Sequence, residues 1–113
     1  MATAKVLAKH GYVVRFIKKS EEYKTKTADA YVDGEQWEFK SPEGSRLVSI
    51  ERCLRRAKNQ SGNIIFDSRR MKNMPDAAIV REILAKAPLI KGIKKIKYID
   101  RRGTCVDIFM NKR

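Results

Sequence analysis

Two carboxylates and a lysine flank the dipeptide Asp33-Gly34 at a spacing that suits catalysis. Asp-Gly between two alternating segments favours a two-residue β-hairpin turn. With that turn, Asp29 faces Glu38 across the strand pair, and Lys40 lies on the same face because side chains alternate. Two carboxylates that face each other repel. We therefore expect either a cation between them or a proton retained by one of them, as is common in catalytic sites. The alternative is a solvated hairpin face with its charges apart in water.

Other candidates lie near predicted helix ends and after a buried strand. His10 precedes Gly11 at a helix end, where it is a candidate acid or base or merely interacts with the helix dipole. Gln60 ends an arginine-rich helix as a candidate catalytic amide or a cap. The cations expected to hold a phosphate backbone, or else to be solvated, are Arg52, Arg55, Arg56, Arg69, Arg70, Lys94 and Lys95.

The overall charge points to a polyanionic partner. The chain has 113 residues, one domain's worth, with 26 Lys and Arg against 13 Asp and Glu and a net charge of +13. A folded domain with this much self-repulsion is expected to bind nucleic acid, which neutralises the charge. The alternative is that the charge serves solubility or attraction to a membrane surface. No membrane-spanning stretch or signal peptide is visible. The single histidine argues against a paired-histidine ribonuclease and a zinc cage. Cys53 and Cys105 read as buried, reduced thiols, with a disulfide between them as the alternative.

Periodicity predicts one α+β domain over residues 1–113, with the order αβββαβαββ and helices packed on a central, mainly antiparallel sheet. A polar loop is expected over residues 18–27. The predicted helices are 3–9, 47–60 and about 75–87, and the predicted strands are 12–17, 28–32, 35–40, 63–67, 93–100 and 104–109.

The same pattern predicts which side chains are buried. One hairpin face shows only apolar side chains and must be core. The second helix is expected to start after Ser45 as its N-cap. The expected core residues are Ala28, Ala30, Val32, Trp37 and Phe39 of the hairpin, Leu47, Ile50, Cys53, Leu54 and Ala57 of the second helix, and Ile79, Val80, Ile83 and Leu84 of the third.

Three strings of the chain resemble the C-terminal tRNase domain of contact-dependent growth inhibition toxins. They are LAKHGYVVRFI, ADAYVDGEQWEFKSPEGS and IERCLRRAKNQSGNIIFD, and the resemblance runs from about Leu7 to Ile108. The matching positions are Gly11, Tyr12, Asp29, Gly34, Glu38, Lys40, Pro42 and Gln60.

This resemblance implies a ribonuclease of the barnase–EndoU–colicin–RelE type, metal-independent and without a cofactor, that cuts tRNA. Glu38 would be the general base, or pair with Lys40, and Asp29 would orient Lys40. Lys40 and Arg69 would stabilise the charge that develops on the phosphate. The implied protein is a monomer held inactive by a cognate immunity protein. It would act in the bacterial cytoplasm after delivery as the C-terminal part of a secreted or phage-borne carrier.

A second resemblance competes with the first. A helix, three strands carrying Asp and then Glu-x-Lys, a helix and a strand also form the core pattern of PD-(D/E)xK nucleases. There Asp29 (or Asp33) and Glu38 would hold Mg²⁺, with Lys40 beside them, and the target would be RNA or DNA. A third reading is a non-catalytic RNA-binding module. The acidic pair favours an enzyme, because carboxylates repel phosphate and add nothing to a pure binder.

Overall fold

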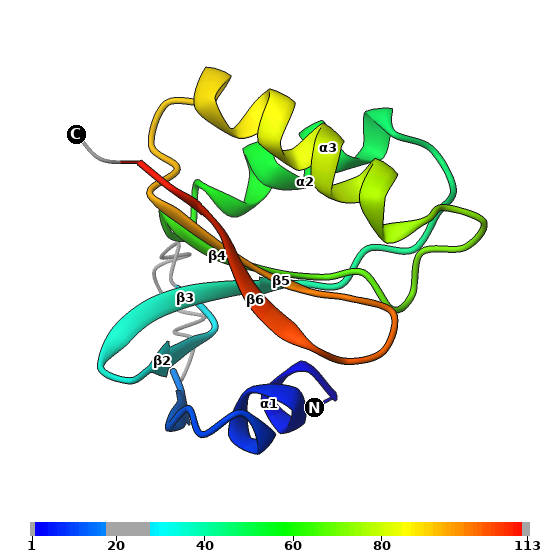
Figure 1. Ribbon diagram of the computed structural model, residues 1–113. Helices are drawn as coiled ribbons and strands as arrows, with labels where there is room; N and C mark the ends of the chain where they lie inside the picture. Colours follow the sequence, from blue (N-terminus) through cyan, green and yellow to red (C-terminus); the bar gives the residue numbers. More distant parts are fainter. Residues whose placement is uncertain (1, 18–27, 112–113) are drawn as a thin grey trace.

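In the computed structural model, which describes residues 2–17 and 28–111, a six-stranded sheet separates two helices from a third (Figure 1). The predicted loop over residues 18–27 lies outside the described residues. The α+β class, with helices packed on a sheet, is confirmed. The helices are α1 (Ala2–Lys9), α2 (Val48–Ala57), α3 (Asp76–Lys86) and a short 3-10 helix η1 (Ala87–Leu89). The strands are β1 (Val14–Phe16), β2 (Ala30–Val32), β3 (Glu35–Lys40), β4 (Asn63–Asp67), β5 (Lys95–Ile99) and β6 (Cys105–Met110).

The sheet is mixed: three of its five strand pairings are antiparallel, in line with the expected mainly antiparallel arrangement, and the two central pairings are parallel. Its strands lie in chain order, β1 to β6. Hairpins make β1–β2, β2–β3 and β5–β6 antiparallel, whereas β3–β4 and β4–β5 are parallel. The physical reason is that α2 and α3 carry the chain back across the sheet between successive central strands. The uninterrupted apolar run of β4, buried on both faces, was a sequence signal for this pairing.

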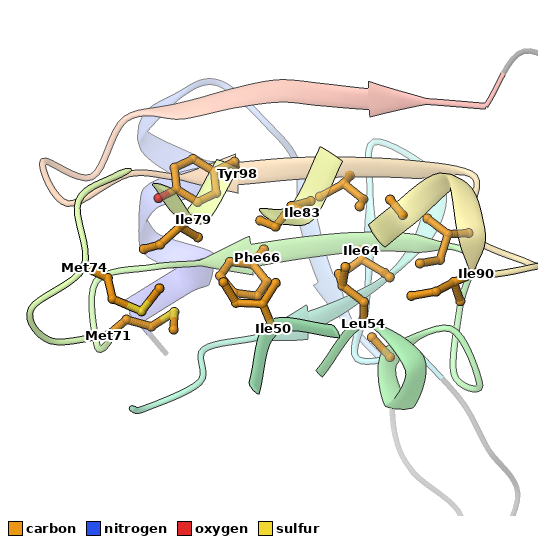
Figure 2. Close-up of a cluster of buried hydrophobic side chains, with 14 residues drawn as sticks. Ile50, Leu54, Ile64, Phe66, Met71, Met74, Ile79, Ile83, Ile90 and Tyr98 are labelled. Carbon is orange, nitrogen blue, oxygen red and sulfur yellow. The ribbon is translucent and has the colours of Figure 1, made fainter. Parts of the chain in front are cut away.

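Two hydrophobic cores fill the space between the layers. Figure 2 shows the larger one, where α2 and α3 pack on one face of the sheet through residues such as Ile50, Leu54 and Ile83. The smaller core lies on the other face, under α1, and contains Leu7, Val32, Trp37, Phe39, Ile65 and Ile99, among others. Truncating one fully buried leucine or isoleucine to alanine would cost about 2–5 kcal/mol. The sheet therefore has a hydrophobic core on each of its two faces.

Two residues expected in the core are exposed. Leu47 is 43% exposed because α2 begins only at Val48, and Leu84 is 42% exposed because α3 packs through Ile79 and Ile83 instead. Ser45 is not the N-cap either: that position is Leu47, which makes no side-chain capping bond. The five hairpin residues expected in the core, Ala28, Ala30, Val32, Trp37 and Phe39, are all buried. Within residues 2–17 and 28–111, no helix has the length and apolar character needed to cross a membrane.

Candidate active site

A tight turn at Asp33 and Gly34 aligns the strands that carry the predicted acids. Both residues have positive φ, 48° and 87°, as a two-residue type I′ turn requires. The Asp33 carboxylate accepts a hydrogen bond from the backbone N–H of Val13 (2.7 Å), which ties the turn to the chain entering β1. The pairs Ala30–Trp37, Tyr31–Gln36 and Val32–Glu35 confirm the predicted register.

Alternation along β3 places Glu38 and Lys40 on the face of the sheet that α2 covers. Their parallel neighbours on β4 are Ile64 and Phe66, which belong to the larger core. Glu38 is only 5% exposed, and its Oε2 lies 3.4 Å from Nζ of Lys40. A buried carboxylate is costly unless it is paired, so this lysine stabilises the charged form of Glu38.

Asp29 holds the neighbouring backbone of β3. The paired residues of β2 and β3 end at Ala30–Trp37, so Asp29 is not a ladder partner of Glu38. Its Oδ2 accepts the N–H of Phe39 (2.7 Å), the residue between Glu38 and Lys40, and its own N–H donates to the carbonyl of Trp37 (3.1 Å). Asp29 therefore contacts the segment that presents both candidate groups.

A basic hollow of about 340 Å³ opens beside this pair; we call it the arginine hollow. Arg52 and Arg56 lie one helical turn apart on α2, so both reach the same side as Lys40. At its edge, Arg70 donates to the carbonyl of Ser41 (3.2 Å) and pairs with Glu43. The full lining is Lys40, Ser41, Pro42, Glu43, Ser49, Arg52, Cys53 and Arg56. Positive charge dominates the lining, which suits a phosphate group.

Cys53 sits in the same hollow as an uncharged thiol. Burial raises its pKa to about 11, against the opposing effect of the cations Lys40 and Arg56. A thiol with so high a pKa carries little thiolate at neutral pH. Cys53 and Cys105 are both free, as expected from their spacing, but each is only partly buried, not fully buried as predicted.

Two of the predicted phosphate-binding arginines are engaged elsewhere. Arg55 pairs with Glu51 on the exposed side of α2 (2.8 Å). Arg69 forms two side-chain hydrogen bonds to Asp67 (2.9 and 2.7 Å), which also accepts the Thr3 hydroxyl (2.8 Å). Burial would raise the pKa of Asp67, but these hydrogen bonds hold it below its usual value. The Arg69 charge is thus neutralised on the face of the sheet that α1 covers.

The remaining candidates do not line the arginine hollow. His10 joins the end of α1 to β6: its Nδ1 lies 2.9 Å from the carbonyl of Val6, and its Nε2 accepts the N–H of Cys105 (3.4 Å). Gln60 is half-buried in the turn after α2. Lys94 lines a separate hollow with Lys95, whose Nζ pairs with Glu35.

Sequence reasoning missed a buried lysine on the opposite face of the sheet. Lys97 is 8% exposed, and its Nζ donates to Asp107 (2.7 Å) and Tyr12 (3.1 Å) and lies 5.1 Å from the ring centre of Trp37. Burial would lower its pKa, but these two hydrogen bonds raise it. We call the adjoining cavity of about 410 Å³ the lysine hollow; it is lined by Tyr12, Val32, Asp33, Glu35, Trp37, Lys95, Lys97, Asp107, Ile108, Phe109 and Met110. The signal was a lysine flanked on both sides by apolar residues within the strand sequence KIKYI.

Comparisons with known proteins identify a family from the sequence and a related fold from the structure. The model of the contact-dependent growth inhibition CdiA C-terminal domain matches residues 26–105. A solved structure described as a CdiA-CT/CdiI toxin and immunity complex from Burkholderia pseudomallei superposes with a TM-score of 0.72. That match is 24% identical and covers 94% of this chain and 78% of the other, which shows a shared fold. No curated protein sequence matches. Since the family model spans well over half of the chain, this chain belongs to the contact-dependent growth inhibition CdiA C-terminal domain family.

Proposed function

We propose that this toxin domain is a nuclease that cuts RNA, with tRNA as its target. The observation that carries the proposal is the pairing of a buried carboxylate with a lysine at the edge of a basic hollow. Glu38 and Lys40 are 3.4 Å apart, and Lys40 lines the hollow together with Arg52 and Arg56. A phosphodiester in that hollow would meet three cations and have a carboxylate close by.

Each side chain has a distinct role in the proposed cleavage. Glu38 accepts the proton of the attacking nucleophile as a general base. Lys40 and one arginine of the hollow stabilise the negative charge that builds up on the phosphate oxygens. This arginine is Arg52 or Arg56, because Arg69 is committed to Asp67. Asp29 positions the β3 backbone through Phe39.

The topology favours the metal-dependent form of this chemistry. A helix, three antiparallel strands, a helix and a parallel fourth strand occur here in the order that the PD-(D/E)xK resemblance implies. The donor chemistry suits the ion, because Glu38 and Asp29 supply carboxylate oxygens, which Mg²⁺ prefers. The described residues contain no group of three or more His, Cys, Asp or Glu side chains placed to hold a metal ion, so water or phosphate oxygens would have to supply the other ligands.

In this form, Asp29 and Glu38 would hold the Mg²⁺ ion. The ion would supply Lewis-acid activation of water and of the phosphate. The chain's own contribution is unchanged, because Lys40 still neutralises charge beside Glu38 and the arginines still hold the backbone.

Incubating the protein with unfractionated tRNA, with and without EDTA, tests both the activity and the metal. We expect fragments with defined ends, lost in EDTA and restored by excess Mg²⁺. Cleavage that persists in chelator would reject the metal-dependent form and leave the metal-independent one. Intact tRNA that nevertheless binds in a salt-sensitive manner would indicate a binding module instead.

We also propose a cognate immunity protein as the partner. The solved structure with the same fold is a toxin and immunity complex, and the net charge of +13 on this chain suits an acidic partner. As a family member, the domain would be delivered from a secreted carrier and act in the cytoplasm of the target bacterium. Co-expression of the immunity protein should then restore growth of cells that make this chain.

A further inference from the structure

A row of three side chains crosses the sheet next to the proposed catalytic pair. Strand pairing places Arg15 of β1 opposite Tyr31 of β2, and Tyr31 opposite Gln36 of β3. All three are exposed, and the amide of Gln36 lies 3.4 Å from the Tyr31 hydroxyl. The row therefore combines a cation, an aromatic ring and an amide on one level of the sheet.

This row lies on the same face as the candidate catalytic groups. Gln36 precedes Glu38 by two residues on β3, and side chains two residues apart point to the same face. From the strand rise, the row is roughly 7 Å from Glu38 and roughly 13 Å from Lys40 along β3. A nucleic-acid strand running along this face would thus pass Tyr31 within a few nucleotides of the cut.

A hollow next to the ring has the chemistry of a base site. Its volume is about 430 Å³, and it is lined by Val13, Arg15, Tyr31, Asp33 and Gly34. Val13 is 66% exposed and Tyr31 is 37% exposed, so the hollow presents an apolar surface and a ring edge or face to solvent. The charges of Arg15 and Asp33 offset each other, unlike those of the arginine hollow. A neutral, flat ligand with polar edges fits this site better than a phosphate.

We propose that Tyr31 stacks on an unpaired base of the RNA substrate next to the cut, with Arg15 and Gln36 beside the base edge. The inference rests on the proposed nuclease function and extends it, because it makes an unpaired nucleotide a requirement for recognition. Stacking of a base on an aromatic side chain is tolerant of sequence and strong enough to measure. Tyr31 is a binding residue in this scheme and takes no part in the proton transfers.

Binding of a fluorescein-labelled single-stranded RNA nonamer to the Glu38→Gln protein, chosen to suppress cleavage, tests the stacking. Tyr31→Ala and Tyr31→Leu should weaken binding roughly 5- to 150-fold, whereas Tyr31→Phe, which keeps the ring, should bind like the parent. The same nonamer with its bases removed should bind all four proteins equally. Melting temperatures of the variants check that the sheet is intact.

Two results would overturn the proposal. One is equal binding by the Leu, Phe and parent proteins. The other is an equal loss of affinity for the normal and the base-free strand, since that would place the contact on the backbone. Cleavage of tRNA by the wild-type protein, measured in parallel, keeps the two proposals apart. If tRNA is cut but Tyr31→Leu binds normally, only the stacking fails; if wild type neither binds nor cuts RNA, both fail.

Discussion

The arginine hollow and the lysine hollow lie on opposite faces of one sheet, and they differ in whether their basic side chains are paired with acidic ones. In the lysine hollow, Lys97 is paired with Asp107, and Lys95 with Glu35. In the arginine hollow, Lys40 meets Glu38, but no ion pair among the described residues involves Arg52 or Arg56. Cations without a protein counterion are the ones available to a phosphate. Pairing, more than the number of basic residues, separates a candidate site from a structural cluster.

The largest difference between the two hollows should appear in catalysis. We expect Glu38→Gln or Lys40→Met to reduce tRNA cleavage by about 10²–10⁴-fold, because each removes a group that we propose to act at the reacting phosphate. Lys97→Met, the matched change in the lysine hollow, should leave cleavage close to wild type. Initial rates on tRNA check this, with Glu43→Gln as a rim control. Full activity in the Glu38 and Lys40 variants would move the site elsewhere.

The ion pair between Arg69 and Asp67 should contribute to the stability of the fold and not to cleavage. Asp67→Ala leaves Arg69 and Thr3 without their buried partner, so we expect a loss of about 2–4 kcal/mol in the free energy of unfolding. Cleavage per folded molecule should stay unchanged. Urea unfolding followed by Trp37 fluorescence measures the loss. Because the folded pKa of Asp67 is lowered, its contribution is present above the unfolded pKa of about 3.9 and is lost as the pH falls through the lower folded value.

Neighbouring arginines of α2 provide an internal control for phosphate binding. Arg52→Ala and Arg56→Ala should each weaken RNA binding, and each should reduce the slope of log affinity against log salt by about 0.7–0.9. Arg55→Ala should have a smaller effect, because Arg55 is already paired with Glu51. Binding isotherms at several salt concentrations supply the slopes. Equal slopes for all three variants would mean that the ion pair does not decide which arginine is used.

The smallest effect concerns the thiol inside the arginine hollow. Burial raises the pKa of Cys53 to about 11, so its contribution to stability is fully present below the unfolded pKa and is lost as the pH rises through about 11. We expect the melting temperature of wild type to fall more steeply than that of Cys53→Ala between about pH 9 and 11. Thermal melts across this range measure it. Parallel curves would show that Cys53 ionises as freely in the folded protein as in the unfolded chain.

Short-range sequence patterns predicted the hairpin, but they did not predict the parallel pairing of strands that a helix connects. The turn at Asp33-Gly34 requires positive φ, which its residue types favour, and the register then follows from counting. Parallel pairing of β3 with β4 depends on where α2 docks, and periodicity alone does not specify that. The burial of Glu38 follows from the same docking, so the predicted open polar face became a partly covered one.

The candidate site divides in the same manner. Asp29, Glu38 and Lys40 could be placed together because they flank one turn, although Asp29 contacts the Phe39 backbone and not Glu38 through the ladder. The arginines differ in how far away their partners are. Arg55 and Arg69 pair with acids four and two residues away, a spacing that can be read in the sequence. Arg70 pairs with Glu43, 27 residues away, and composition does not reveal such a pair.

Strand β3 belongs to both halves of the sheet, pairing with β2 through a local turn and with β4 across a helix. The proposed catalytic pair sits on that shared strand, while two of the cations beside it come from α2. A chain that has closed only its hairpin would hold the carboxylate and lysine in water, with no hollow around them. Toxicity would then be a property of the finished fold alone, and a chain in transit, still unfolded, would be harmless to the cell that makes it.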